Sequence, residues 1–174
     1  MRAEIAHYRA NLQTGRDAAG VAALRRECAA IVARELGREE DVLDALVASI
    51  VFTPYPDVPP ALERWRAAGL RLVVVSNWDV SLHEALERTG LAALVDGAVS
   101  SAEAGAAKPD PRIFARALEI AGVAAASAVH VGDEPEADVA GARAAGIEAV
   151  LLDRDSRGHP GVRTATSLAD LALP

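Results

Sequence analysis

The sequence predicts an α/β protein in which a parallel sheet, covered by helices on both faces, follows a purely helical segment. Three observations support this fold class. Residues 1–52 show only helical periodicity, short β-branched runs alternate with helical stretches beyond Pro60, and a glycine follows each of several helical stretches. A chain of 174 residues can bury one substantial core, with room for a small appendage.

Residues 1–52 carry apolar side chains at helical spacing, which predicts two or three amphipathic helices. The residues that set this pattern are Ile5, Tyr8 and Leu12, then Val21, Leu24, Cys28 and Ile31, then Val42, Leu46 and Ile50. The junction FTPYPDVPP, residues 52–60, is rich in proline, which ends one helix and starts another. We therefore expect a helical domain over residues 1–52 and an α/β domain over residues 53–174.

Beyond the junction, four short apolar runs predict strands: LRLVVV at 70–75, DGAVSS at 96–101, AVHV at 128–131 and EAVLL at 148–152. Helical stretches between them end in glycines that suit the left-handed residue after a helix, namely Gly69, Gly90, Gly122 and Gly146. This alternation implies a parallel sheet with right-handed crossovers. Ligands of such sheets bind at the carboxyl ends of the strands, so we expect the chemistry directly after these runs.

Composition excludes several classes of function. A formal net charge of −7 argues against a nucleic-acid partner, because binding to phosphate backbones relies on clustered Lys and Arg. The single cysteine, Cys28, excludes an intramolecular disulfide and favours a reducing cytoplasm. No run approaches the roughly 20 apolar residues of a membrane span, and the first residues lack a signal peptide's apolar region, so we expect no membrane partner. The oligomeric state is not indicated.

Ser76-Asn77-Trp78-Asp79 follows the first predicted strand. A hydroxyl, an amide and free backbone N–H groups ahead of a helix form a cradle for an anion. The alternative interpretation is structural: Ser76 and Asn77 make a turn, while Asp79 or Ser81 caps the next helix.

Lys108 is the only lysine in the chain. It precedes Pro109, which favours an extended backbone, and Asp110 and Pro111 then suit the N-cap and first position of a helix. A compact ammonium group can neutralise a phosphoryl oxygen or a carboxylate in a way that arginine's planar fork does not reproduce. The alternative is a loop lysine without a function.

The stretch HVGDEPEAD, residues 130–138, places four carboxylates within six residues. Carboxylates this close disfavour one another's ionised state unless a cation or hydrogen-bond donors offset them. Oxygen ligands of this kind suit Mg²⁺, which makes Asp133 and Asp138 candidate metal ligands. Asp138 also lies in the first turn of a helix opened by Pro135, where the helix dipole stabilises a carboxylate without any metal. We expect His130 to be a hydrogen-bonded core residue.

These residues resemble the haloacid dehalogenase-like hydrolase superfamily, in particular its capped phosphatases of the phosphoglycolate phosphatase-like subgroup. Three motifs match in order: VVVSN with Ser76, GAAKPDPRIF with Lys108, and GDxxxxD with Asp133 and Asp138. The resemblance implies a Rossmann-like core and makes residues 1–52 part of an α-helical cap. Glu134 departs from the small hydroxyl residue usual at its position.

The resemblance also implies a mechanism. In this family an aspartate attacks the phosphorus of a small phosphorylated substrate, and Mg²⁺ bridges carboxylates and phosphate. By motif position, Ser76 and Asn77 would bind phosphate, Lys108 would be a catalytic residue that neutralises nucleophile and phosphate, and Asp133 and Asp138 would hold Mg²⁺.

The family's first motif, an apolar strand ending in DxDx(T/V), does not occur ahead of the helical segment. In the family this strand lies between those ending at Ser76 and Asp133. We therefore expect a chain shortened at its N-terminus, lacking the central strand and the nucleophile, with little or no hydrolysis. VLLDRDS, residues 150–156, has the apolar-then-DxD form, but its place after the acidic motif disfavours Asp153 as a permuted nucleophile.

Two other functions remain open from the sequence. A 2-haloacid dehalogenase would displace halide with a carboxylate and needs no divalent metal, and the retained acidic motif weighs against it. A non-catalytic module could hold an anion or a protein partner in the same cradle, but it would have no need of Ser76, Lys108, Asp133 and Asp138 together.

Overall fold

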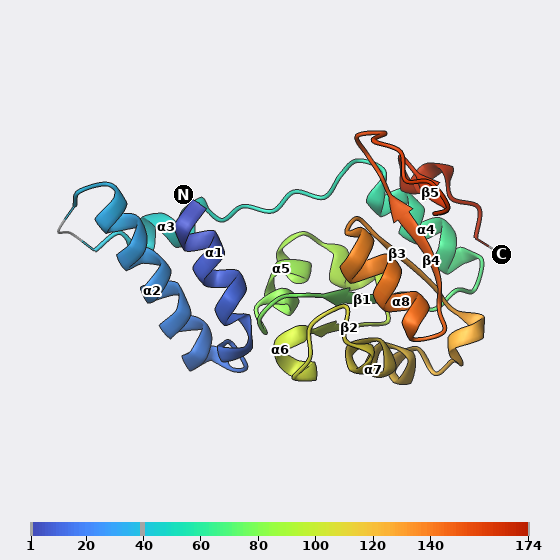
Figure 1. Ribbon diagram of the computed structural model, residues 1–174, viewed down its shortest axis with the longest axis horizontal. Helices are drawn as coiled ribbons and strands as arrows, with labels where there is room; N and C mark the ends of the chain where they lie inside the picture. Colours follow the sequence, from blue (N-terminus) through green and yellow to red (C-terminus); the bar gives the residue numbers. More distant parts are fainter. Residues whose placement is uncertain (1, 39–40, 174) are drawn as a thin grey trace.

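The computed structural model describes residues 2–38 and 41–173. Its first part is helical and lies to one side of the molecule, joined to the rest by an extended segment over residues 50–54 (Figure 1). The helical elements are α1 (Arg2–Asn11), the 3₁₀ turn η1 (Leu12–Thr14), α2 (Ala18–Glu35) and α3 (Leu43–Ser49). Asp17 caps α2 by accepting a hydrogen bond from Gly20 N at 2.8 Å. Helical structure before residue 52 is thus confirmed, while the domain boundary there stays a prediction.

The second part contains parallel strands that alternate with helices. The strands are β1 (Val73–Ser76), β2 (Gly97–Ser100), β3 (Val129–Gly132), β4 (Glu148–Leu152) and β5 (Thr164–Ala165). The main helices are α4 (Val58–Ala67), α5 (Leu82–Arg88), α6 (Ser101–Ala104), α7 (Pro111–Ala121) and the π-helical segment η4 (Pro135–Ala140), which continues into α8 (Gly141–Ala144). Short 3₁₀ turns complete it: η2 (Leu91–Leu94), η3 (Ala125–Ser127) and η5 (Leu168–Asp170).

The predicted α/β class is confirmed element by element. Each of the four apolar runs overlaps a strand, and every paired strand is parallel. The glycines expected after helices have positive φ, for example +69° at Gly122 and +77° at Gly146. Only β5 was not predicted, because two residues carry no readable alternation.

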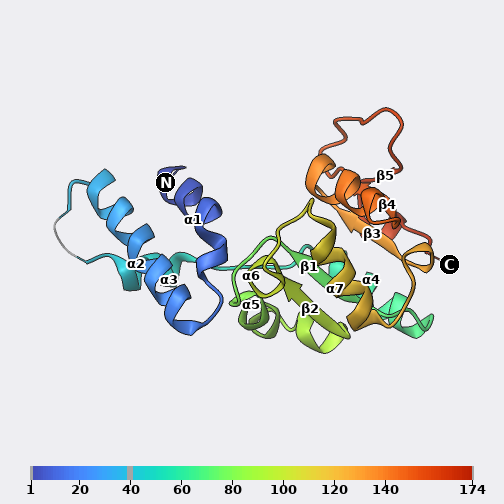
Figure 2. The same cartoon turned by 60° about the horizontal axis from the view of Figure 1, so that its bottom comes forward.

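The strands form two separate sheets. One has the order β1-β2 and the other β3-β4-β5, and no ladder joins β1 to β3 within the described residues. Figure 2 shows the pair β1 and β2 in green apart from the orange strands β3 and β4. The side chains of β1 and β3 are only half-buried, whereas Ala149, Val150 and Leu151 of β4 are buried. The facing edges of β1 and β3 are therefore unpaired, at the place where the family resemblance implies a further strand.

A shared core nevertheless holds the two sheets together. Phe114 and Ile113 of α7 are almost completely buried, and they pack with Val99 of β2 and with Leu151 of β4. Burial of each such side chain stabilises the fold by about 1.5–3 kcal/mol. Val150, on the opposite face of β4, packs in a second cluster with α4 and the C-terminal turn. The strand ends that carry polar residues thus have fixed positions without a continuous ladder.

Among the described helices, none is both long enough and apolar enough to pass through a bilayer.

Candidate functional site

The ammonium group of Lys108 lies where the two sheets approach each other. Its Nζ donates to the backbone oxygen of Val75 in β1 at 3.0 Å and to Oδ1 of Asp138 in η4 at 2.5 Å. The Lys108 side chain is only 11% exposed and that of Asp138 only 3%. A single charged side chain thus connects the end of β1 with the segment that follows β3.

Asp138 accepts hydrogen bonds on both carboxylate oxygens. Oδ1 accepts from Lys108 and lies 2.8 Å from His130 Nε2, and Oδ2 accepts from the backbone N–H of Glu134 at 3.0 Å. Burial raises the pKa of Asp138, but the contact with His130 and the charge and hydrogen bond of Lys108 outweigh it and hold the pKa well below its usual range. The carboxylate is therefore ionised. His130 is the hydrogen-bonded core residue that the sequence predicts, and its ring also meets Phe114 edge-on.

Gly132 allows Asp138 to reach this position. A Cβ atom at Gly132 would lie 2.1 Å from Cγ of Asp138, closer than any non-bonded approach permits. The glycine of the GDxxxxD motif is thus required by the close contact of a carboxylate with the strand end, and not by its backbone angles.

Asn77 fixes the loop that carries Lys108. Its Oδ1 accepts from the backbone N–H of Lys108 at 2.7 Å, and its Nδ2 donates to the backbone oxygen of Lys108 at 3.0 Å. Asp110 then caps α7 by accepting from Arg112 N at 2.9 Å, and Pro111 takes the first helical position, as predicted. The amide of Asn77 therefore positions the lysine, while its predicted contact with phosphate stays a prediction.

The hydroxyl of Ser76 makes no hydrogen bond with the described residues, and it lies half-buried at the carboxyl end of β1. The adjacent loop is held by Ser101, whose Oγ accepts from Trp78 N and donates to Trp78 O, both at 3.1 Å. No local sequence pattern predicts this contact between Ser101 and Trp78. The Ser-x-x-Glu spacing of Ser100 and Glu103 is a capping-box signature, and the structure contains that box at the start of α6.

The two predicted metal ligands differ in their surroundings. Asp133 is exposed just beyond β3 and has no hydrogen bond or ion pair with the described residues, whereas both oxygens of Asp138 are engaged. Within the described ranges, no three His, Cys, Asp or Glu side chains gather closely enough to hold a metal ion. These residues alone therefore do not form a Mg²⁺ site, and the metal roles of Asp133 and Asp138 stay predictions.

Asp153, the alternative nucleophile considered from the sequence, closes a turn after β4. Its Oδ2 accepts from Gly158 N at 2.9 Å, and the backbone hydrogen bonds from Gly158 and Arg157 lower its pKa. Asp155 pairs with Arg157 at 2.5 Å. Both carboxylates therefore have structural partners in the loop itself.

The helical segment contacts the site through Asp79, which is 2% exposed. Tyr8 of α1 donates to its Oδ2 at 2.9 Å, and the N–H of Val80 donates to Gly15 O at 3.0 Å. Burial and the charge of Asp79 raise the pKa of Tyr8 above its usual range, so the phenol is neutral. Ser81 stands at the N-cap of α5 without a side-chain cap, and Asp79 accepts its backbone N–H. No local pattern indicated a contact between residues 71 positions apart.

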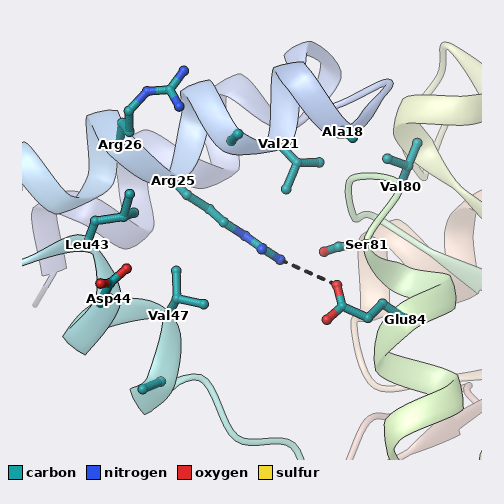
Figure 3. A pocket seen from close by; sticks show the side chains of 12 residues that line it. Ala18, Val21, Arg25, Arg26, Leu43, Asp44, Val47, Val80, Ser81 and Glu84 are labelled. Atoms are coloured by element: carbon teal, nitrogen blue, oxygen red, sulfur yellow. Dashed lines mark ion pairs between the residues drawn. The ribbon is translucent and has the colours of Figure 1, made fainter.

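A cavity of about 590 Å³ lies between the helical segment and the start of α5 (Figure 3). Its lining residues are Ala18, Val21, Ala22, Arg25 and Arg26 of α2, Leu43, Asp44, Val47 and Ala48 of α3, and Val80, Ser81 and Glu84.

The chain matches the model of a known protein family. The family model described as haloacid dehalogenase-like hydrolase matches residues 3–146. The chain belongs to this family. The match includes the helical segment, the Ser76 loop, Lys108 and Asp138, and it ends just ahead of β4.

Relatives of this haloacid dehalogenase-like hydrolase resemble it over part of their length. It is 43% identical over 98 residues to haloacid dehalogenase-like hydrolase domain-containing protein 3 of Bos taurus, and 43% identical over 104 residues to a phosphoserine phosphatase of Thermus thermophilus. These matches cover 56% and 59% of this chain but only 39% and 42% of the relatives. The chain thus matches about two-fifths of the length of these relatives.

The fold is shared with solved structures of the family. The L-2-haloacid dehalogenase from Xanthobacter autotrophicus superposes with a TM-score of 0.74 over 97% of this chain and 80% of that one. At 22% sequence identity this likeness establishes the fold alone.

Proposed function

We propose that this hydrolase provides the phosphate-binding and charge-neutralising residues of a phosphatase that acts on a small phosphomonoester. The proposal depends mainly on the position of the Lys108 ammonium group. Hydrogen bonds to Val75 O and to Asp138 hold this group at the carboxyl ends of β1 and β3. A phosphatase among the curated relatives supports the same reaction class.

The geometry leaves Lys108 able to act on a ligand. An ammonium group has three N–H donors, and two are used by Val75 O and Asp138, so one remains for a phosphoryl oxygen or an attacking carboxylate. The hydroxyl of Ser76 offers a further donor nearby on β1. Donors that are fixed in advance in a partly buried site stabilise the negative charge of a phosphoryl group in the transition state.

The nucleophile is the missing part of this site. Asp138 is fully hydrogen-bonded, and Asp153 closes its own turn. We propose that the attacking aspartate belongs to a strand outside these 174 residues, which would pair with β1 and β3. The open edges of both strands support this. Mg²⁺ would belong to that completed site, where Asp133 offers one carboxylate and the added strand would supply others.

The test compares hydrolysis with binding. We expect the 174-residue chain to hydrolyse p-nitrophenyl phosphate with Mg²⁺ only at background rate, and to bind inorganic phosphate in NMR titrations at the amides of residues 76–79. Lys108→Met should abolish these shifts. Arg116→Met, which removes an exposed cation of α7, is the matched control and should leave them unchanged. Robust turnover by the chain alone would overturn the missing nucleophile, and phosphate shifts that survive in Lys108→Met would overturn the phosphate site.

A dehalogenase is the second candidate, because a solved structure that is 27% identical to this chain, with a TM-score of 0.66, is that of a 2-haloacid dehalogenase from Pseudomonas syringae. Release of chloride from 2-chloropropionate without a divalent metal would favour it over the phosphatase. A purely binding module would bind phosphate but stay inactive even after an apolar strand ending in Asp-x-Asp is fused ahead of residue 1. The phosphatase proposal predicts that this fusion gains activity.

A further inference from the structure

Residues 76–81, the Ser76 loop, are held from two sides. Toward the α/β part, the side-chain amide of Asn77 exchanges two hydrogen bonds with the backbone of Lys108. Toward the helical segment, the contacts are made by the side chain of Asp79 and the backbone of Val80. The loop that carries the proposed phosphate site therefore also connects that site to the helical segment.

Tyr8 compensates the burial of Asp79. Its hydroxyl donates to Oδ2 of Asp79 at 2.9 Å, while Oδ1 accepts from Ser81 N at 2.7 Å. Among the described residues, Tyr8 is the only donor to Oδ2, and Asp79 is 2% exposed. Without the Tyr8 hydroxyl, one oxygen of a buried carboxylate would have no donor, which is strongly unfavourable. The loop would then have to move until water reached that oxygen.

The turn that follows η1 fits closely against Asp79. Gly15 O accepts from Val80 N at 3.0 Å, and a Cβ atom at Gly15 would lie only 2.5 Å from Cβ of Asp79. The turn η1 itself packs against α6, so the helical segment and the α/β part meet at this place (Figure 2). The helical segment thus leaves Asp79 little freedom to move.

The position of Asp79 affects the donors that the loop offers to an anion. The N–H groups of Trp78, Val80 and Ser81 all have acceptors within the protein. The hydroxyl of Ser76 and the backbone N–H of Asp79 make no hydrogen bond with the described residues. A displacement of Asp79 would therefore redirect an unused N–H that lies close in sequence to Ser76.

We propose that Tyr8 is a positioning residue, which through Asp79 sets the conformation of the Ser76 loop, so that the helical segment controls how tightly the α/β part binds phosphate. The phosphate ligand rests on the proposed function, whereas the effect of Tyr8 on the loop does not. Because such coupling is reciprocal, phosphate bound at Ser76 strengthens the contact between the loop and the helical segment.

The test uses the full 174-residue chain, with inorganic phosphate as the probe in ¹H–¹⁵N spectra. Tyr8→Phe removes the hydroxyl and keeps the ring. We expect this variant to bind phosphate about five- to tenfold more weakly than the wild type, as measured at the amides of residues 76–79. Without phosphate, the Ser81 N–H should exchange about tenfold faster, because its acceptor Asp79 is no longer held in place.

Gly15→Ala reaches the same loop by a different route. The added methyl group would push Asp79 away from the turn while leaving the Tyr8 hydroxyl in the chain. We expect the same two changes as in Tyr8→Phe, namely weaker phosphate binding and faster exchange of the Ser81 N–H. Wild-type values of both in Gly15→Ala would contradict a route through Asp79.

Tyr55→Phe is the matched control, because it makes the same chemical change at the other tyrosine, which is 60% exposed. Asp17→Ala is a control for stability: it removes the cap of α2 and destabilises the helical segment without removing a contact of the loop. Both controls should keep the phosphate affinity and the Ser81 exchange of the wild type, and thermal unfolding should show each variant folded. A purely structural role of Tyr8 predicts that Tyr8→Phe behaves like Asp17→Ala, and that result would overturn the inference.

Two outcomes separate this inference from the proposed function. If phosphate produces no response in the wild type, but Tyr8→Phe shifts the amides of residues 76–79 and speeds exchange at Ser81, the phosphatase proposal fails. The role of Tyr8 in setting the loop is then kept. If the wild type binds phosphate and Tyr8→Phe binds it equally tightly, the inference fails and the phosphatase proposal is kept.

Discussion

Asp138 is the residue on which the site depends most. Its carboxylate is buried and ionised because Lys108, His130 and the N–H of Glu134 donate to it together. The same contacts keep the only lysine at the end of β1. Any change that removes the negative charge leaves a largely buried ammonium without its counter-ion, and such losses are among the most destabilising single changes known in proteins.

Asp138→Asn should therefore lower the free energy of unfolding by about 3 kcal/mol. Urea denaturation at neutral pH measures this. Asp133→Asn is the matched control: it removes a neighbouring but exposed carboxylate, and we expect a change below about 0.5 kcal/mol. Similar losses in both variants would mean that the pair with Lys108 contributes little.

At the scale of elements, a network around Asp57 joins the start of α4 to the C-terminal part of the chain. Its Oδ2 accepts from Ser167 Oγ and Leu168 N, each at 2.8 Å, and from Arg154 at 3.1 Å. The guanidinium of Arg154 also lies 4.0 Å from the ring centroid of Tyr55. These contacts hold β5 and the last turn against α4. The two residues of β5 could not fix this part of the chain by their own strand pairing.

The Asp57 network should make stability depend on pH. Burial raises the pKa of Asp57, but the hydrogen bonds from Arg154, Ser167 and Leu168 outweigh it and lower the pKa to about 2. The folded state therefore binds its proton less readily than the unfolded chain, whose Asp has a pKa near 3.9. The resulting stabilisation, about 1–2 kcal/mol, is complete above pH 5 and disappears as the pH falls toward 2.

Thermal unfolding of the wild type and Asp57→Asn between pH 6 and pH 2 measures this effect. The difference between the two should be largest at pH 6 and shrink in acid. Asp155→Asn, which removes an exposed carboxylate that pairs with Arg157, should show no comparable trend. A difference that stays constant down to pH 2 would contradict the assignment.

For the whole molecule, the divided sheet is the dominant feature. Among the described residues, β4 has a parallel partner on each side, whereas β1 and β3 each have one. An edge strand presents unpaired backbone groups to whatever lies beside it, and its hydrogen bonds open more readily than those of a central strand. The two sheets are therefore held together by side-chain packing around α7 and by the contacts of Lys108. No continuous ladder of backbone hydrogen bonds joins them within the described residues.

Amide hydrogen exchange should reveal this division. We expect the slowest exchange in residues 149–151 of β4 and markedly faster exchange in β1 and β3, because each of these has one unpaired edge. A fused strand that pairs with both should slow β1 and β3 and leave β4 nearly unchanged. Protection of β1 and β3 equal to that of β4 in the chain alone would show that their edges are already covered.

Local patterns predicted much of this architecture. The β-branched runs marked β1 to β4, and the glycines after helices marked where those helices end, because strand propensity and left-handed glycine are properties of a few neighbouring residues. The same reasoning placed Ser76 and Asp133 directly after strands, and it assigned His130 to a hydrogen-bonded core position.

Contacts between distant residues were beyond such patterns. The hydrogen bond between Tyr8 and Asp79, the use of Asn77 to hold the Lys108 backbone, and the network of Asp57 with Ser167 each join segments that only folding brings together. The sequence singled out Asp133 and Asp138 as candidate metal ligands, with stabilisation by a helix dipole as the alternative role of Asp138. The structure separates them into an exposed group and a buried, fully hydrogen-bonded one.

The sequence by itself determined the fold class, the order of the elements and the chemical types gathered at the strand ends, because these follow from short-range spacing. Tertiary structure decided which of those groups remain available to a ligand. Lys108 keeps one N–H donor and Ser76 keeps its hydroxyl for a ligand. Both carboxylate oxygens of Asp138, in contrast, are engaged by neighbouring groups. Arg25 lines a cavity. That outcome depends on the packing of helices and strands far apart in the chain, and their relative positions set every distance at the site.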